Sequence, residues 1–145
     1  MVQLLPFEPS HISSVIELWK RSEGVSIGVA DSPEEISRYL DHNPGMSFVA
    51  MSEERVVGAI LGGHDGRRGY LHHLAVDAGH RRLGIGQALV DRSLAALEKI
   101  GIERSHVFVQ SDNEAGRVFW ERAGWRQRED LIMYSFQQDW AKSKK

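Results

Sequence analysis

The sequence contains no cysteine. This absence excludes a disulfide framework, a thiol nucleophile and thiolate ligands for a metal ion. A chain without cysteine also fits a reducing compartment, so we expect a cytoplasmic protein.

Long hydrophobic runs and an excess of one charge are missing as well. No apolar stretch approaches the roughly 20 residues of a membrane span, and the start Met1–Pro6 lacks the regions of a secretory signal. The 145 residues carry 18 Lys and Arg against 20 Asp and Glu, which gives no general attraction to nucleic acid or to an anionic membrane. We expect neither partner, and a single domain over residues 1–145.

Motifs of common phosphate and metal sites are also absent. The chain has no G-x-x-x-x-G-K-[ST] run, and no G-x-G-x-x-G run with an acidic residue about twenty positions later. His64, Asp65, His72, His73 and His80 do not form an H-E-x-x-H pattern, so no metal is expected.

Two helices are predicted in the first third of the chain, after a short strand over residues 2–7. Apolar side chains recur at helical spacing from Ile12 to Trp19, which predicts a helix over residues 11–22. The run Ser32-Pro33-Glu34-Glu35 combines an N-cap serine, a first-turn proline and a glutamate three residues on, which predicts a second helix to about His42.

Three strands follow these helices. Apolar runs over residues 46–51 and 56–61 flank a polar tetrapeptide at 52–55 and predict a hairpin. The third strand is expected at Tyr70–Val76. Between them, Gly62–Gly69 is expected to form an irregular, glycine-rich loop, either a plain connection or a segment that selects a substrate.

The second half of the chain is expected to contain two helices and three strands. In chain order these are a helix over 84–100, a buried strand at Val107–Val109, a helix that ends before Gly124, and strands at Trp125–Gln127 and Leu131–Phe136. The whole order combines antiparallel hairpins with one β-α-β crossover, which favours an α+β fold.

The segment before the helix at 84–100 has the features of an anion site. A helix N-terminus offers backbone N–H groups without intrahelical partners, together with a partial positive charge. Gly84 and Gly86 leave room for a diphosphate to approach the backbone, and Arg81 and Arg82 can add charge-assisted hydrogen bonds. The pattern therefore indicates phosphate binding.

Two motifs in fixed order carry a family resemblance. The strand end Leu74-Ala75-Val76 is followed by R-x-x-G-x-G over Arg81–Gly86, and N-x-x-(small)-x-x-F-W-x-x-x-G-W extends from Asn113 to Trp125. Through these motifs the chain resembles the GNAT superfamily of acetyl-CoA-dependent N-acetyltransferases. The resemblance covers nearly the whole chain. It looks most like small bacterial single-domain members related to the YpeA group, and less like the ribosomal-protein alanine acetyltransferases.

The resemblance implies a fold and a set of residues that bind acetyl-CoA. The fold is a twisted, mixed and mostly antiparallel sheet of about six to seven strands flanked by four helices. The backbone of Leu74-Ala75-Val76 would bind the pantetheine arm as an added strand does, Asn113 would hydrogen-bond to it, and Phe119 and Trp120 would lie near its cysteamine end. The diphosphate-binding turn would consist of Arg81, Arg82, Leu83, Gly84, Ile85, Gly86 and Gln87.

The usual proton carriers of the family are replaced in this chain. Many members have a glutamate base five positions before the asparagine and a tyrosine acid seven positions after it. Here these positions hold Phe108 and Trp120, and indole has only a weak N–H donor, so it cannot replace the tyrosine as the acid.

Histidines of the third strand are the alternative bases. Strand alternation places His72 on the face of Leu74 and His73 on the opposite face, and imidazole, with a pKa of about 6.5, suits proton transfer at neutral pH. We prefer His72, because its offset from the Leu-Ala-Val segment matches relatives that use a histidine there. Tyr134 and Ser111 are the candidate acids.

The sequence thus predicts an acyltransferase that moves an acetyl group from acetyl-CoA to a primary amine of a small molecule or peptide, through direct attack in a ternary complex. A non-catalytic acetyl-CoA sensor or interaction module is the alternative, and a protein that binds another nucleotide is a third reading. Asn113 also suits a plain helix N-cap. A homodimer is left open.

Overall fold

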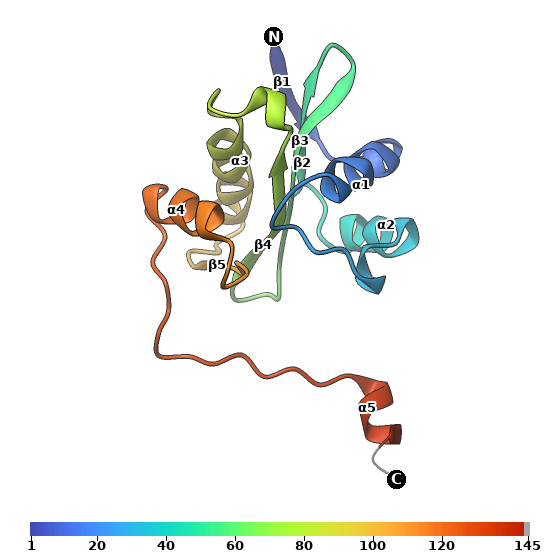
Figure 1. Ribbon diagram of the computed structural model, residues 1–145, viewed down its shortest axis with the longest axis vertical. Coiled ribbons are helices and arrows are strands. Elements are labelled where there is room, and N and C mark those ends of the chain that lie inside the picture. The colour runs from blue at the N-terminus through green and yellow to red at the C-terminus, as the bar shows by residue number, and fades with distance from the viewer. Residues whose placement is uncertain (144–145) are drawn as a thin grey trace. The chain divides into compact units, whose positions relative to one another are not determined.

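The computed structural model describes residues 1–143, in two compact units that meet in sequence at Asn113 and Glu114. The first unit contains all the strands (Figure 1). Its elements are β1 (Val2–Pro6), η1 (Pro9–His11), α1 (Ile12–Lys20), η2 (Val29–Asp31), α2 (Pro33–His42), β2 (Phe48–Ser52), β3 (Arg55–His64), β4 (Gly69–Val76), η3 (Ala78–His80), α3 (Ile85–Lys99) and β5 (Ser105–Val107). The second unit contains α4 (Glu114–Arg122) and α5 (Gln138–Ser143).

One sheet with the order β1-β2-β3-β4-β5 forms the centre of the first unit. The strands are antiparallel to their neighbours, except that β4 and β5 are parallel. Helices α1 and α2 lie on one side of the sheet and α3 on the other (Figure 1). The predicted α+β class and the mixed, mostly antiparallel sheet are confirmed, with five strands in place of six to seven.

The two strands predicted after α4 do not form. Residues 125–137 contain no helix or strand, and a short helix, α5, follows them. Most apolar side chains of Leu131–Phe136 are exposed, Tyr134 to 89%. An apolar run becomes a strand only where another strand pairs with it, and among the described residues this run has no ladder.

Half of the glycine-rich segment predicted as a loop lies in the strands of the β3–β4 hairpin, and residues 65–68 form the connection between them. β3 continues through Gly62 and Gly63 to His64, and β4 begins at Gly69. A methyl group on Gly62 would collide with the carbonyl oxygen of Met46, and one on Gly63 with the Tyr39 hydroxyl. These two glycines therefore allow other parts of the chain to pack closely against the strand. Their flexibility had suggested a loop.

The main hydrophobic core lies between the sheet and the pair α1 and α2. Trp19 is fully buried at its centre. The cluster consists of Phe7, Ile12, Val15, Leu18, Trp19, Ile36, Leu40, Val49, Val56, Ala59, Leu61 and Ala75. On the other face of the sheet, a Cβ added to Gly58 would lie 3.1 Å from Ile85 Cγ2 and 3.2 Å from Leu89 Cδ1. The start of α3 therefore packs directly on β3.

Candidate functional site

A bulge interrupts β4 at the two histidines. Ala75 pairs with Ala59 and His72 pairs with Leu61, so the single β3 residue between them lies opposite both His73 and Leu74. His73 has a φ of 51°, a left-handed conformation that is uncommon for a residue with a side chain. Such an extra residue disrupts the ladder locally and bends the strand.

β4 and β5 diverge just before this bulge. Their pairing covers only Gly69 to Leu71, and β5 ends at Val107, earlier than the predicted strand at Val107–Val109. β4 continues to Val76, so within the first unit the segment His72–Val76 has no strand on its β5 side. A strand edge without a neighbouring strand can pair with an extended ligand that carries amides. We call this segment the β4 edge.

The β4 edge leads directly to the N-terminus of α3. Val76 pairs with Gly58, the glycine on which Ile85 of α3 packs. Gly84, the N-cap residue of α3, has a φ of 79°, and the first bond of the helix is donated by the Ala88 N–H to the Gly84 carbonyl, at 3.0 Å. The N–H groups of Ile85, Gly86 and Gln87 thus have no intrahelical acceptor.

Residues between β4 and α3 form a compact, charged turn. The Asp77 carboxylate accepts hydrogen bonds from the Gly79 N–H at 3.2 Å and from Arg21 at 3.2 Å, and it lies 3.0 Å from His80 Nδ1. These bonds, above all the one with His80, lower the pKa of Asp77. Arg81 Nε lies 3.4 Å from the Val76 carbonyl oxygen. The predicted anion-binding residues therefore follow a turn fixed to the end of β4.

Both histidines of β4 lie on the face covered by α1 and α2. The His72 ring contacts the ring of Tyr39 on α2, with centroids 6.2 Å apart, and the His73 ring contacts Trp19 on α1, at 4.9 Å. The prediction that His73 points to the opposite face is wrong, because the bulge at φ 51° redirects its side chain.

The His72 ring lies among aromatic side chains. Besides Tyr39, it stacks on Tyr70 at 6.4 Å and on Phe108 at 6.2 Å between centroids. Burial, and secondarily the neighbouring His73, lower the pKa of His72, while Asp31 acts in the opposite direction. The buried position therefore favours the neutral form of the His72 ring.

His73 is held by contacts from two other elements. Its Nε2 lies 3.1 Å from Oδ1 of Asp31, the last residue of η2, and its carbonyl accepts a hydrogen bond of 2.9 Å from Trp19 Nε1. The sequence pattern did not identify Asp31 as a site residue, because no local motif signals a contact between residues 42 positions apart.

The segment between α1 and α2 also contacts the residues after β5. Gln110 donates a hydrogen bond to the Ser26 hydroxyl. The Asn113 side chain lies against Gly24, where a methyl group would collide with its amide. This segment therefore contacts β4 through Asp31 and the loop after β5 through Ser26. It connects the two strands on the side where they diverge.

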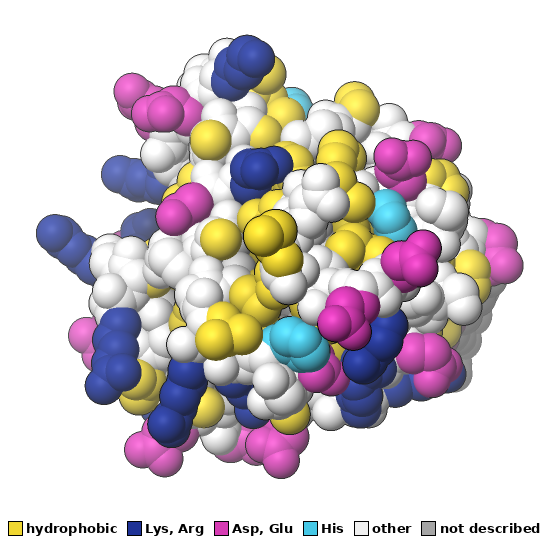
Figure 2. Space-filling model, turned by 90° about the horizontal axis from the view of Figure 1, so that it is seen from above, with side chains coloured by type: hydrophobic (Ala, Val, Ile, Leu, Met, Phe, Trp, Pro, Cys, Tyr) yellow, Lys and Arg dark blue, Asp and Glu magenta, His cyan; other side chains and the backbone are white. Residues whose placement is uncertain are grey.

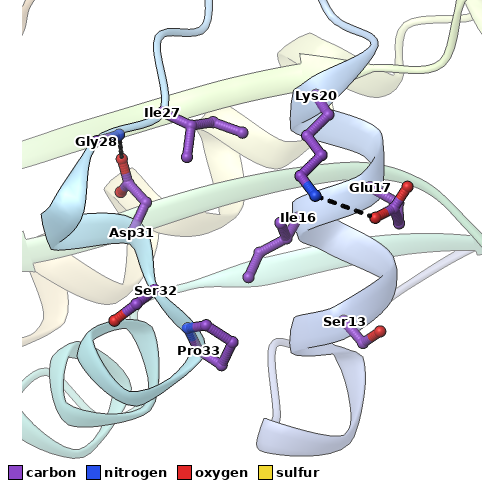
Figure 3. Close-up of a pocket in the computed structure, with 9 residues that line it drawn as sticks. All are labelled: Ser13, Ile16, Glu17, Lys20, Ile27, Gly28, Asp31, Ser32 and Pro33. Carbon is purple, nitrogen blue, oxygen red and sulfur yellow. Dashed lines mark hydrogen bonds and ion pairs between the residues drawn. The ribbon is translucent and has the colours of Figure 1, made fainter.

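A pocket of about 400 Å³ lies between α1 and the segment Ile27–Pro33 (Figure 3). Its lining is mixed, with Ile16 and Ile27 as apolar members and the exposed ion pair of Glu17 and Lys20 on α1. Asp31 borders this pocket, accepts a hydrogen bond from the Gly28 N–H at 3.0 Å, and also contacts His73.

The remaining predicted residues belong to the second unit. Trp120 is buried there, with its ring 5.1 Å from Phe119 and 4.8 Å from Trp125 between centroids. Tyr134 lies in the segment that follows α4 and is exposed.

Two other features are absent from the described part of the chain. Over residues 1–143, no group of three His, Cys, Asp or Glu side chains is arranged to hold a metal ion. Among the helices of that range, none is long and apolar enough to cross a membrane.

Comparison with known proteins identifies the fold and the family. The acetyltransferase of Sodalis glossinidius (strain morsitans) is 30% identical over 133 residues, 91% of this chain and 92% of its own length, and that of Photorhabdus laumondii is 32% identical over 135 residues, 92% and 94% of the two chains. The crystal structure of the PaiA N-acetyltransferase from Thermoplasma acidophilum, in complex with coenzyme A, superposes with a TM-score of 0.78 at 15% identity, covering 90% of this chain and 93% of that one. Residues 12–125 match the Acetyltransferase (GNAT) family. The chain belongs to this family and is an acyltransferase.

Proposed function

We propose that the protein transfers the acetyl group of acetyl-CoA to a primary amine, by direct attack of the amine on the thioester in a ternary complex. The observation that carries this proposal is the continuity of the β4 edge with the N-terminus of α3. The pantetheine arm pairs with the β4 edge, and the diphosphate accepts hydrogen bonds from the N–H groups of Ile85, Gly86 and Gln87.

Further residues assist binding of the cofactor. Arg81 and Arg82 add charge to the diphosphate site, and Leu83, which is exposed between them and Gly84, borders it. Asn113 binds the pantetheine arm from the loop that follows β5. Phe119 and Trp120 of α4 act near the cysteamine end. The family match extends across the boundary between the two units, which supports one acetyltransferase domain over residues 1–145.

The chemical step begins with removal of a proton from the acceptor. An alkyl ammonium has a pKa of about 10.4, so roughly one molecule in a thousand is nucleophilic at pH 7 without a base. The free amine attacks the carbonyl carbon, the C–N bond forms and the C–S bond breaks. Backbone N–H groups of the β4 edge stabilise the oxyanion. The chain has no cysteine for an acetyl-enzyme intermediate, which supports direct attack.

His72 and His73 are the candidate bases. Both belong to the β4 edge, and their rings lie on the α1 and α2 face of β4. The leaving thiolate, with a pKa of about 8.5, needs little assistance and takes a proton from the outgoing ammonium or from water. Tyr134 is a candidate donor for this second transfer.

The acceptor is a primary amine of a small molecule or peptide. The face of the molecule in Figure 2 carries Lys and Arg as well as Asp and Glu side chains, interspersed with apolar ones. No single sign of charge dominates this face, so a panel of amines is the appropriate probe.

One observation favours a second candidate, a non-catalytic acetyl-CoA sensor. Phe108, at the position where many relatives have the glutamate base, is a non-titrating side chain that is 59% exposed and stacked on His72. A sensor would keep the β4 edge and the α3 N-terminus while lacking amine-dependent turnover.

A thermal-shift experiment with acetyl-CoA, CoA and ATP tests the cofactor. We expect acetyl-CoA and CoA to raise the melting temperature and ATP to leave it unchanged. Stabilisation by ATP alone would contradict the proposal and favour another nucleotide. Thiol release from acetyl-CoA with polyamines, amino acids, aminoglycosides and peptides then separates the enzyme from the sensor.

A further inference from the structure

Asp31 and His73 form a carboxylate–imidazole pair between two segments distant in sequence. Asp31 Oδ1 lies 3.1 Å from His73 Nε2, and only 12% of the Asp31 side chain and 24% of the His73 side chain are exposed. A pair so largely shielded from solvent is screened less than a surface ion pair.

The pair defines the protonation of the ring nitrogens. An ionised carboxylate only accepts hydrogen bonds, so His73 Nε2 carries a proton and donates it to Asp31. In the neutral ring, Nδ1 then has the lone pair. Among the described residues no hydrogen bond reaches Nδ1. The arrangement is that of a base oriented by a third group.

Both partners of this pair are fixed independently. Asp31 Oδ2 accepts the Gly28 N–H at 3.0 Å, which holds the carboxylate at the end of η2. On the other side, Trp19 Nε1 donates to the His73 carbonyl at 2.9 Å, and the Trp19 ring packs edge-on against the imidazole. The imidazole is therefore held in one orientation before any substrate binds.

His72 lacks such a partner. Its ring contacts Tyr39, Tyr70 and Phe108, and no carboxylate bonds to it among the described residues. Burial lowers its pKa, which weakens it as a proton acceptor. Of the two histidines, His73 has the better geometry for a base.

We propose that Asp31 is a positioning residue that keeps the His73 proton on Nε2, so that Nδ1 takes the proton from the acceptor ammonium. This inference rests on the proposed acetyl transfer. One N–H bond of the ammonium breaks and a bond to Nδ1 forms. The nitrogen lone pair then attacks the thioester carbon and the C–S bond breaks. A second N–H bond of the attached nitrogen breaks as its proton passes to the CoA thiolate, and the imidazolium releases the first proton to solvent.

Nitrogen-15 NMR of the histidine rings tests the proton position without turnover. In the unsubstituted protein the His73 signals, assigned by their loss in His73→Asn, should show a protonated Nε2 and a bare Nδ1. In Asp31→Asn the amide can donate to Nε2 or accept from it, so the His73 signals should move to a mixture of tautomers. Ser32→Ala is the matched control, because it removes the adjacent helix cap, where Ser32 Oγ accepts from the Glu35 N–H, and should leave the tautomer unchanged.

Steady-state kinetics with the amine that gives the fastest thiol release tests the roles of Asp31 and His73 in proton transfer. Asp31→Asn should lower kcat about tenfold or more with an unchanged Kd for acetyl-CoA, and His73→Asn should lower it about 100-fold or more. Asparagine tolerates the positive φ of position 73, so this variant keeps the bulge. Ser32→Ala should keep the original kcat.

The outcomes distinguish this inference from the proposed function. A protonated Nδ1 in the original protein, an unchanged kcat in Asp31→Asn, or loss of turnover in His72→Ala but not in His73→Asn would overturn the role of the pair. The expected tautomer without turnover on any amine would instead contradict the acetyl transfer, and the role of Asp31 would fail with it.

Discussion

Trp19 and His73 are joined both by a hydrogen bond and by ring packing. The indole Nε1 donates to the His73 carbonyl at 2.9 Å, and the two ring centroids lie 4.9 Å apart at an interplanar angle of 70°. The core residue Trp19 thereby holds the one β4 residue with a positive φ. The conformation of the bulge is thus linked to the packing of the hydrophobic core through Trp19.

Replacement of Trp19 by phenylalanine tests this link. Trp19→Phe keeps an aromatic ring but leaves the partly buried carbonyl of His73 without its donor. We expect a loss of about 1–3 kcal/mol in the free energy of unfolding, measured by urea denaturation. A variant as stable as the original protein would show that the bulge does not depend on this bond.

The close packing of β3 is tested by two glycine substitutions. In Gly62→Ala the new methyl collides with the Met46 carbonyl oxygen, which also accepts a hydrogen bond of 2.8 Å from the buried Ser93. Because backbone cannot rotate away, we expect a loss of about 1–3 kcal/mol of stability. Gly58→Ala is the control, since its nearest contacts are side-chain carbons at 3.1–3.3 Å, and it should cost less. Equal losses would contradict the assignment of Gly62 to tight backbone packing.

The N-terminus of α3 is tested with a matched pair of glycines. Gly84 and Gly101 lie next to opposite ends of α3, have φ values of 79° and 90°, and have open space around an added Cβ. Alanine at either position should therefore cost about 1–2 kcal/mol in strain.

Only one of these two variants should weaken the binding of acetyl-CoA. By isothermal titration calorimetry, Gly84→Ala should bind acetyl-CoA at least about tenfold more weakly, equivalent to about 1.4 kcal/mol, because its methyl group would lie in the proposed diphosphate site. Gly101→Ala should bind as the original protein does. Equal affinities of the two variants would show that the diphosphate does not bind at this turn.

Stability should depend on pH through His72. Its pKa is lowered from 6.5 in the folded protein, mainly by burial, while His73 and Asp31 act on it in opposite directions. Between the lowered pKa and 6.5 the unfolded chain binds more protons than the native state, so the free energy of unfolding falls as pH decreases through this interval. Above 6.5 this destabilising effect disappears.

Comparison with His72→Phe isolates this contribution. Urea denaturation from about pH 8 to about pH 5 should show the stability of the original protein falling relative to the variant below the ordinary histidine pKa of about 6.5. A constant difference over that range would mean that the folded protein does not disfavour the charged imidazole.

Local signals in the sequence were sufficient for most helices. The capping pattern at Ser32 placed the start of α2, which begins at Pro33 with the Ser32 hydroxyl accepting from the Glu35 N–H. The glycine at position 84 indicated the start of α3. Such features depend on neighbours within a few residues, which a single sequence displays directly.

Features that depend on distant contacts were not predictable in this way. The bulge at His73 has no local signature, and its contact with Asp31 joins residues 42 positions apart. Gly62 and Gly63 suggested a loop, whereas the real constraint comes from Met46 and Tyr39 packed against them. The apolar run after Asp130 had the composition of a strand but has no strand partner among the described residues.

Amine-dependent release of thiol from acetyl-CoA tests whether the protein transfers acetyl groups to amines. We expect that at least one class of amine accelerates thiol release, that mass spectrometry finds the acetyl group on that amine, and that His73→Asn removes the acceleration while still binding acetyl-CoA. Tight binding of acetyl-CoA without amine-dependent thiol release across polyamines, amino acids, aminoglycosides and peptides would contradict acetyl transfer to amines, and would identify the protein as a sensor of the cofactor.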